Sequence, residues 1–374
     1  MKISVFTDLR FTESKIPTGV GKHITQMVQG LARMEGNQVS ILAARDQACK
    51  NELRPTSSLS FLASQRLPLP WKAAEALWTV AGGPAVDKYC RGSDWVYCPK
   101  NDFIPLNHTR LAVTIHGAHE LDWHMPQSSN CGARLNRIRR RLSYRRIVGR
   151  ADLILTVSEF LKEQIITWFG CDEDRIEVIG NGVEREYFDV ANQPVGLSGR
   201  SMDRPYLLCV GGLNDLDGGD QILRVAKILG REHPDIRLLV AGSQNEREYL
   251  AVAQTLDNME LLGYVPTARL APLMRDAQAL LFLTKYETFG IAAAEAMAAG
   301  TTVITSGGTA VPEIVGDAGL YVSNQARDVV DAILRMADDP AYIENLRIVG
   351  RHRARQLSWG ACVERLMTVL KLKS

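Results

Sequence analysis

The stretch from residue 281 to residue 305, LFLTKYETFGIAAAEAMAAGTTVIT, holds the side chains best suited to bind a sugar and a phosphate. Its apolar start predicts a buried strand that ends at Thr284. A loop with Glu287 and Gly290 follows, and the alanine-rich run after it predicts a helix that Gly300 ends. A strand, a glycine-containing loop and a helix in this order place polar groups at the edge of a parallel sheet, where ligands bind.

The start of this helix predicts an anion site. The backbone N–H groups of Phe289, Gly290 and Ile291 lack partners inside the helix, and the helix dipole favours phosphate oxygens there. Glu287 precedes this site, whereas Glu295 lies eight residues on, more than one turn inside the helix. We therefore expect two separate hydrogen-bond acceptors, one for sugar hydroxyls and one for the vicinal hydroxyls of a ribose. The alternative is that Glu287 is a solvated loop residue and that Glu295 lies on a polar helix face.

The elements that must position these groups follow from the rest of the pattern. Short apolar runs alternate with helical patterns along the whole chain, which predicts an α/β fold with doubly wound parallel sheets. The expected strands are short and rich in Val, Ile or Leu, and they comprise residues 3–7, 39–43, 95–98, 111–115, 153–157, 176–179, 206–210, 237–241, 259–262, 279–283 and 303–305.

At 374 residues the chain is long for one hydrophobic core, so two domains are expected. Residues 192–205, NQPVGLSGRSMDRP, contain prolines and glycines but few apolar side chains, which predicts a linker. We expect domains at residues 1–195 and 204–355, with ligand groups at the carboxyl ends of their strands in a cleft between them. Residues 356–374 are expected to form a terminal helix.

Composition excludes several classes of function. The 44 Lys and Arg residues against 42 Asp and Glu residues leave a formal charge of +2, which gives no argument for nucleic acid binding. The N-terminal residues lack the apolar core of a secretory signal, and no apolar run approaches the about 18 residues of a membrane-spanning helix. We therefore expect a cytoplasmic protein. Seven cysteines without a CxxC pair or clustered histidines predict reduced thiols, not disulfides or a zinc site.

Two segments resemble the retaining glycosyltransferases of family four. The motif of that family, Y-E-x-F-G-x-x-x-x-E-A-M-A-x-G-T-x-V-I, stands here as YETFGIAAAEAMAAGTTVI, and GTAVPEIVGDAGLYV (308–322) resembles the segment that follows it. The resemblance implies a GT-B fold, a nucleotide-diphosphate sugar as donor substrate with no cofactor or divalent metal, and retention of the anomeric configuration. It implies that Glu287 is catalytic, that Glu295 binds the donor, and that residues 356–374 cross back to the first domain.

Further segments extend this resemblance over nearly the whole chain. TGVGK (18–22) resembles the family's glycine loop after the first strand, so Gly19 and Gly21 are expected near the donor phosphate or the acceptor, as is Gly211 after the first strand of the second domain. LAVTIH ends in His116, where the family commonly places a histidine that contacts the donor sugar. A hydrogen-bonded structural histidine is the alternative. The next loop offers acceptor-side candidates, namely His119, Asp122 and His124.

The chain departs from the family where cations usually neutralise the donor diphosphate. The family reads V-G-R-L-x-x-x-K-G, whereas this chain reads VGGLNDLDGGD, with Gly212 in place of Arg and Asp217 in place of Lys. Lys285 or Arg10 could substitute, the donor could carry less charge, or transfer could have been lost. We also expect that the chain supplies no Asp-x-Asp metal motif where the donor would need it.

A basic helix is predicted at RLNRIRRRLSYRRIVGR (134–150), with eight arginines and with Leu135, Ile138, Leu142 and Ile147 on an apolar side. Such a helix could bind anionic lipid, or it could be a solvated basic face whose apolar residues pack on the sheet. The expected partners are thus a nucleotide sugar donor, a glycan or lipid-linked acceptor, no nucleic acid, and the inner face of a membrane through residues 134–150.

The resemblance therefore implies a hexosyltransferase in bacterial polysaccharide or lipopolysaccharide synthesis. Two alternatives stay open. One is a GT-B enzyme that acts on a small-molecule acceptor. The other is a degenerate GT-B protein that binds sugar or a partner without catalysis, which the residues at 212 and 217 favour.

Overall fold

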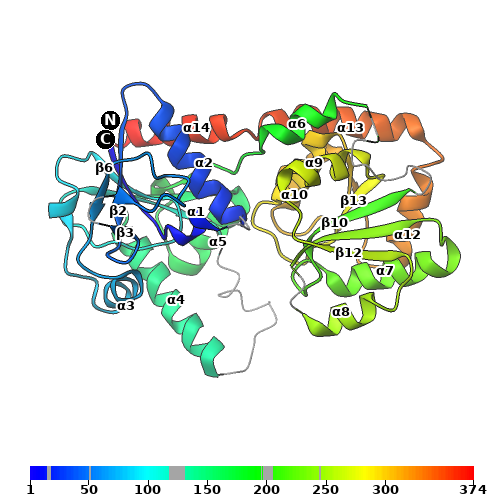
Figure 1. Ribbon diagram of the computed structural model, residues 1–374, viewed down its shortest axis with the longest axis horizontal. Coiled ribbons are helices and arrows are strands. Elements are labelled where there is room, and N and C mark those ends of the chain that lie inside the picture. The colour runs from blue at the N-terminus through cyan, green and yellow to red at the C-terminus, as the bar shows by residue number, and fades with distance from the viewer. Residues whose placement is uncertain (15–17, 50–51, 118–130, 195, 197–204, 244–245) are drawn as a thin grey trace. The chain divides into compact units, whose positions relative to one another are not determined.

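The computed structural model describes residues 1–14, 18–49, 52–117, 131–194, 196, 205–243 and 246–374. The chain forms two compact units, drawn in Figure 1: unit 1 combines Met1–Asn181 with Trp359–Ser374, and unit 2 is Gly182–Ser358. The division differs from the expected border near residue 195. The short helix α6 (Arg185–Ala191) belongs to unit 2, because it packs against helices of that unit. Most of the predicted linker lies outside the described residues.

Unit 1 is built on a seven-stranded parallel sheet with the order β5-β2-β1-β6-β7-β8-β9. The strands are β1 (Lys2–Phe6), β2 (Gln38–Ala43), β5 (Ser64–Arg66), β6 (Trp95–Cys98), β7 (Arg110–Ile115), β8 (Leu153–Thr156) and β9 (Ile176–Val178). A small hairpin pairs β3 (Ala48–Cys49) with β4 (Glu52–Leu53). The order reverses between β1 and β6, and a ligand site is expected at such a reversal.

Helices cover both faces of this sheet because alternate strand residues point to opposite sides. Val5 of β1 lies in the core beneath α2 (Gly19–Arg33) and α14 (Trp359–Leu372), whereas the neighbouring Phe6 stacks on Trp71 of α3 (Trp71–Ala81). The unit also contains α1 (Arg10–Glu13), α4 (Cys131–Arg150), α5 (Glu159–Phe169) and the 3₁₀ turns Asp87–Tyr89 and Glu173–Arg175. The C-terminal helix α14 is therefore part of the first domain's core.

Unit 2 has a six-stranded parallel sheet with the order β12-β11-β10-β13-β14-β15. The strands are β10 (Tyr206–Gly212), β11 (Arg237–Ser243), β12 (Met259–Gly263), β13 (Ala279–Phe282), β14 (Thr302–Thr305) and β15 (Gly319–Tyr321). The helices are α6, α7 (Gly219–Glu232), α8 (Arg247–Ala253), α9 (Thr267–Asp276), α10 (Ile291–Ala299), α11 (Val311–Val315), α12 (Ala326–Arg335) and α13 (Pro340–Arg355), with a 3₁₀ turn at Gly316–Ala318. Figure 1 shows α7, α8 and α12 on one side of this sheet and α9, α10 and α13 on the other.

The predicted α/β class with two doubly wound parallel sheets is confirmed. Each of the predicted strands forms within a residue or two of its expected bounds. Two strands in the main sheets escaped prediction, β5 and β15, and each has only three residues. A segment of three residues carries no periodicity, and β5 (SQR) has no apolar residue, so pairing with the neighbouring strand decides its conformation.

Candidate active site

The candidate donor site lies at the point in unit 2 where the strand order reverses. The chain runs outward from β10 through β11 to β12 and then returns to the other side of β10 as β13. The loops that leave β10 and β13 therefore diverge to opposite faces of the sheet, and the space between them can hold a ligand. The loop after β13 contains Glu287. Strand β10 ends at Gly212, and the loop after it contains Asp217.

Hydrogen bonds tie three loops together at this edge of the sheet. The Leu216 carbonyl accepts from the Thr284 hydroxyl at 3.0 Å and from the Lys285 N–H at 2.8 Å. The Glu287 N–H donates to the hydroxyl of Thr309 at 2.9 Å, and the Ala310 N–H donates to the Glu287 carbonyl at 3.2 Å. The backbone around Glu287 is thus held from both neighbouring strands.

Thr309 is a residue that the sequence reasoning missed. Its φ of 56° makes it the one non-glycine residue at positive φ within the described ranges. A β-branched side chain disfavours this conformation, and such strain persists where the surroundings over-determine it. Here the strained residue holds Glu287 by a hydrogen bond. No feature of the segment SGGTAVPE indicates the strain, since it depends on the contact with the preceding loop.

The Glu287 carboxylate folds back onto its own helix start. Its Oε1 accepts from the N–H groups of Thr288 at 2.8 Å and Phe289 at 3.2 Å. The prediction that the Phe289 N–H is free for a phosphate therefore needs correction, because a carboxylate already lies on it. The α10 helix does begin at Ile291, after Gly290 with φ of 97°. Donor binding at this helix start would exchange one anion for another.

The pKa of Glu287 is raised above its ordinary value. Desolvation by burial is the main cause, and the nearby Asp217 carboxylate raises the pKa further, while the N–H groups of Phe289, Thr288 and Gly290 lower it. The folded chain thus holds the ionised Glu287 carboxylate at a cost in free energy. Such costs are typical of functional residues.

Glu295 lies on α10 and is 4% exposed, which makes it a buried carboxylate rather than a polar-face residue. The hydroxyl of Tyr187, from α6, lies beside it. Burial raises the pKa of Tyr187, and the Glu295 carboxylate raises it further. Tyr187 is a second residue that the sequence reasoning missed, because its contact with Glu295 joins segments more than 100 residues apart.

We expect Glu295→Gln to weaken donor binding about 10- to 100-fold, the range for loss of a charge-assisted hydrogen bond. The fold should remain intact, since the amide keeps the size of the carboxylate. Calorimetry with the cognate nucleotide and nucleotide sugar measures the effect. Glu186→Gln, on the exposed face of α6, is the control. Equal affinities for Glu295→Gln and the parent would remove Glu295 from the donor site.

Lys285, a predicted diphosphate contact, lies between two carboxylates of unit 2. Its Nζ is 2.7 Å from Asp215 and 2.9 Å from Asp220, and its side chain is 40% exposed. Desolvation lowers the pKa of Lys285, but the hydrogen bonds to the two carboxylates raise it above its ordinary value. Arg10, the alternative cation, is paired with Asp8 in unit 1 at 2.6 Å. Both candidate cations thus have acidic partners.

We expect opposite effects when the two sides of this ion pair are changed, if Lys285 binds the diphosphate. Lys285→Ala should weaken donor binding about tenfold, whereas Asp215→Asn should tighten it, because a competing carboxylate is removed. Calorimetry with the nucleotide diphosphate measures both. An affinity unchanged in both variants would assign Lys285 to loop structure alone.

The end of β10 and the loop that follows it have a conformation that explains the missing cations in part. Gly211 and Gly212 have φ of 122° and 105°, which disfavours an arginine side chain at position 212. Asp217 is held by Asn214, whose Nδ2 donates to Oδ2 at 2.5 Å, and a Cβ on Gly211 would approach Asp217 Oδ2 to 2.7 Å. Burial raises the pKa of Asp217. The acidic residue is therefore packed into the loop.

The same loop corrects a second sequence expectation. Asp215 and Asp217 form an Asp-x-Asp pair beside the candidate donor site, where none was expected. Their carboxylates have different partners, Lys285 for one and Asn214 for the other. Within the described part of the chain, no group of three or more acidic, His or Cys side chains could hold a metal ion.

His116 lies at the end of β7 in unit 1. Its Nε2 is 2.8 Å from the carbonyl oxygen of Pro99. A carbonyl can only accept, so Nε2 carries the proton and Nδ1 of the neutral ring is an acceptor. Burial lowers the pKa of His116 to about 4, against the opposing effect of the Pro99 hydrogen bond. His116 is thus a neutral imidazole at physiological pH.

His23, on α2, supports His116 and was missed in the sequence. The two rings meet edge-to-face with centroids 4.4 Å apart. His23 Nδ1 donates to Asn181 Oδ1 at 2.7 Å, and its Nε2 lies 3.4 Å from the Tyr97 hydroxyl. Burial lowers the pKa of His23 well below its ordinary value, and His116 lowers it further. Two neutral histidines therefore meet edge-to-face at this edge of the first sheet.

The glycine segment of unit 1 begins helix α2. Gly19 is the first residue of the helix, and the Thr18 hydroxyl accepts from the Gly21 N–H at 3.1 Å. A Cβ on Gly21 would approach the Phe11 carbonyl oxygen to 2.9 Å, so close packing explains why a glycine occupies this position. A phosphate or acceptor contact at Gly19 and Gly21 stays a prediction. The acceptor-side candidates in the loop after β7 lie outside the described residues, namely His119, Asp122 and His124.

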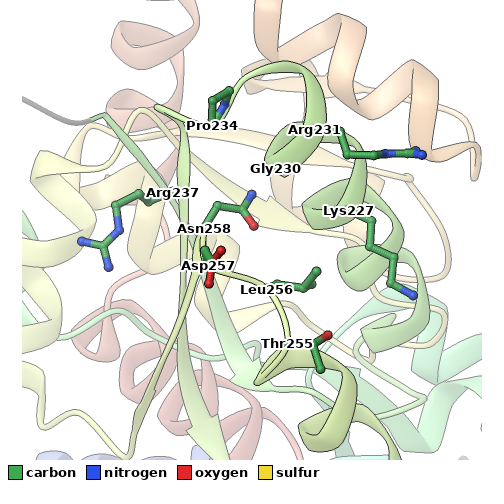
Figure 2. A pocket seen from close by; sticks show the side chains of 9 residues that line it. All are labelled: Lys227, Gly230, Arg231, Pro234, Arg237, Thr255, Leu256, Asp257 and Asn258. Carbon is green, nitrogen blue, oxygen red and sulfur yellow. The ribbon is translucent and has the colours of Figure 1, made fainter.

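A pocket of about 590 Å³ in unit 2 lies away from this site. Figure 2 shows Lys227 and Arg231 on helix α7 and Arg237 and Asn258 across from them. Arg237 begins β11 and Asn258 immediately precedes β12, so the pocket is at the amino ends of the strands. Ligands of open α/β sheets bind at the carboxyl ends, where Glu287 lies.

Comparisons with known proteins agree with this fold. The family model "Glycosyl transferases group 1" matches residues 198–353, and the family model "Glycosyltransferase Family 4" matches residues 17–187. Together with the two parallel sheets, these matches define the class: the chain is a glycosyltransferase of the GT-B type.

Among curated relatives, the O-antigen chain mannosyltransferase B of Escherichia coli is 27% identical over 95% of this chain and 96% of its own length. A D-inositol 3-phosphate glycosyltransferase of Pseudarthrobacter chlorophenolicus is 31% identical over 59% of this chain and 56% of its own. The sucrose-phosphate synthase of Thermosynechococcus elongatus has a similar structure, with a TM-score of 0.74 at 20% identity over 99% of this chain and 98% of that one. HepE of Anabaena, in complex with UDP and glucose, has a TM-score of 0.71 at 15% identity over 99% of each chain.

Proposed function

We propose that this glycosyltransferase moves a hexose from a nucleotide-diphosphate sugar to a glycan or lipid-linked glycan in the synthesis of a bacterial surface polysaccharide. The observation that carries the proposal is the site at the strand reversal of unit 2, where Glu287 lies on the start of α10 and Glu295 is buried behind it. The nearly full-length similarity to an O-antigen chain mannosyltransferase supports the polysaccharide class of acceptor. The proposed place of action is the cytoplasm.

In this proposal the chain's own groups supply the chemistry. The N–H groups at the start of α10 would stabilise the departing diphosphate, since a helix N-terminus favours developing negative charge. The Glu287 carboxylate would then leave these groups and accept from donor-sugar hydroxyls. The Glu295 carboxylate would accept from a ribose. The Nδ1 atom of a neutral His116 can accept a hydrogen bond from a donor-sugar hydroxyl.

The test begins with a thermal-shift screen of UDP, GDP, ADP and their sugars, because a bound ligand stabilises by mass action. The stabilising sugar nucleotide is then assayed for hydrolysis and for transfer to lipid-linked glycan acceptors. NMR of the first product gives its anomeric configuration, and we expect retention. Excess EDTA should leave the rate unchanged. Loss of activity with EDTA and its recovery with magnesium or manganese would contradict metal independence.

A non-catalytic sugar-binding protein is the second candidate function. The acidic loop after β10 favours it, since Gly212 and Asp217 stand where the family has cations and Lys285 is paired with Asp215 and Asp220. This candidate predicts thermal stabilisation by a nucleotide or sugar without even slow donor hydrolysis. A transferase with a small-molecule acceptor would instead hydrolyse the donor but ignore lipid-linked glycans.

A further inference from the structure

The helix α4 has an apolar stripe that faces away from the domain. Leu135, Ile138 and Leu142 are 68%, 59% and 41% exposed. Their spacing of three and four residues puts them on one side of the helix. The residues that bury α4 against unit 1, Tyr144 and Ile147, lie on the other side. The alternative in which the apolar residues of this helix pack on the sheet is therefore wrong for Leu135, Ile138 and Leu142, and only Ile147 is buried.

The neighbouring helix α3 also exposes large apolar side chains. Leu77 and Val80 of α3 are 40% and 69% exposed, and Arg146 of α4 donates to the Val80 carbonyl at 2.7 Å. The two helices thus lie side by side, as Figure 1 shows. Unit 1 exposes seven large apolar side chains within the described ranges, and five of them belong to α3 and α4, the others being Phe61 and Leu372. Such clustering marks an interaction surface rather than scattered exposure.

Arginines border the stripe on both sides. Arg134, Arg141 and Arg145 recur at intervals of seven and four residues, which aligns them along one border, and all three are exposed. Arg139 lies on the other border and pairs with Glu75 of α3 at 3.1 Å. Residues 131–150 contain eight arginines and no Asp or Glu, although the whole chain carries a formal charge of only +2. The positive charge is therefore concentrated around the apolar stripe.

We propose that the exposed faces of α3 and α4 dock this protein on an anionic lipid bilayer. A helix with an apolar stripe bordered by arginines can lie in the interface, with its apolar residues among the lipid chains and its cations at the phosphates. None of the described helices is long and apolar enough to span a bilayer, so the contact would be peripheral. A second copy of the chain fits the surface poorly, because two equally basic faces would repel each other.

The test is flotation of the full chain with vesicles of phosphatidylcholine, alone or mixed with phosphatidylglycerol, at low and high salt. We expect binding only to the mixed vesicles, and weaker binding as salt rises. Two triple variants should each lower the partition coefficient between vesicles and water at least about tenfold. One removes the apolar stripe, by Leu135→Ser, Ile138→Ser and Leu142→Ser. The other removes the arginine border, by Arg134→Gln, Arg141→Gln and Arg145→Gln.

Matched controls separate this surface from general charge and apolarity. Two control variants should bind vesicles as the parent does. One is Ile348→Ser, at an exposed apolar position on α13, and the other combines three exposed arginines of unit 2, as Arg185→Gln, Arg224→Gln and Arg231→Gln. Circular dichroism verifies that every variant is folded. The proposal would be overturned if the parent did not bind mixed vesicles at low salt, or if it bound equally well to phosphatidylcholine alone. It would also be overturned if the control variants lost as much binding as the α4 variants. The proposal would also fail if the parent sedimented as a dimer, the α4 variants sedimented as monomers, and these variants still bound vesicles as the parent does. Because no sugar donor is present, the result is independent of the proposed transfer reaction.

Discussion

Replacement of Glu287 with glutamine is expected to lower kcat/KM for sugar transfer about 100- to 1000-fold, the range for removal of one group that stabilises charge in a closed site. Glutamine can still accept from the Thr288 and Phe289 N–H groups through its amide oxygen, so the loop should keep its conformation. What is lost is the negative charge that strengthens hydrogen bonds from the donor sugar. Affinity for the free nucleotide should change little, because it has no sugar to contact this residue.

The same variant should be at least as stable as the parent at pH 7. The pKa of Glu287 is higher in the folded chain than in the unfolded chain, with burial as the main cause. The folded state therefore binds the proton more tightly, and stability falls as pH rises from the ordinary glutamate pKa through the raised one. Wherever Glu287 is ionised in the folded chain, its carboxylate is a net cost to folding, which glutamine removes. Functional residues often show this trade-off.

Steady-state kinetics and thermal unfolding at pH 7 measure both effects, with Glu186→Gln as the control for a change of charge at an exposed site. A variant with normal turnover would show that Glu287 only caps α10. A variant that loses both activity and stability would show that the carboxylate holds the loop, and would contradict the assigned contact with the donor sugar.

The second large effect is a loss of stability in unit 1 as pH falls from about 6.5 to about 4. The pKa of His116 is lowered by burial to about 4, so in this window the unfolded chain binds a proton that the folded chain does not. Unfolding is then favoured as pH falls, by roughly 3 kcal/mol from this residue over the whole window. His23 acts in the same direction, because burial also lowers its pKa.

Tryptophan fluorescence can follow this transition in unit 1 alone. The six tryptophans of the chain are at positions 71, 78, 95, 123, 168 and 359, all within that unit. His116→Gln, whose amide can still donate to Pro99, should flatten the dependence of the free energy of unfolding on pH. His352→Gln, on the exposed part of α13, is the control. An identical pH dependence in His116→Gln and the parent would show that His116 accepts a proton in the folded chain.

The catalytic rate should accordingly lack a step near pH 6.5 from His116. A neutral imidazole over the physiological range suits a residue that accepts a hydrogen bond from a sugar and does not transfer protons. A rate that rises with pH near 6.5 in the parent but not in His116→Gln would contradict this assignment.

The sequence alone predicted most of the fold, including the strand, loop and helix that contain Glu287 and Glu295. Strands such as β6 and β7 are short apolar runs between polar segments, and alternation with helical periods is a local property of the chain. The strand, loop and helix around Glu287 were likewise readable, because Gly290 and Gly300 mark the ends of α10. Local backbone preferences and hydrophobic periodicity suffice for such elements.

Only the tertiary structure decided which groups these elements bring together. His23 and Asn181 are 158 residues apart in sequence, and Tyr187 reaches Glu295 from another helix, so no local pattern contains either contact. For a related reason, the sequence could not show which face of α4 packs against the domain. Its leucines and isoleucines have the same periodicity whether they face the sheet or the solvent, and only the extent of the domain beneath them determines that three are exposed and one is buried.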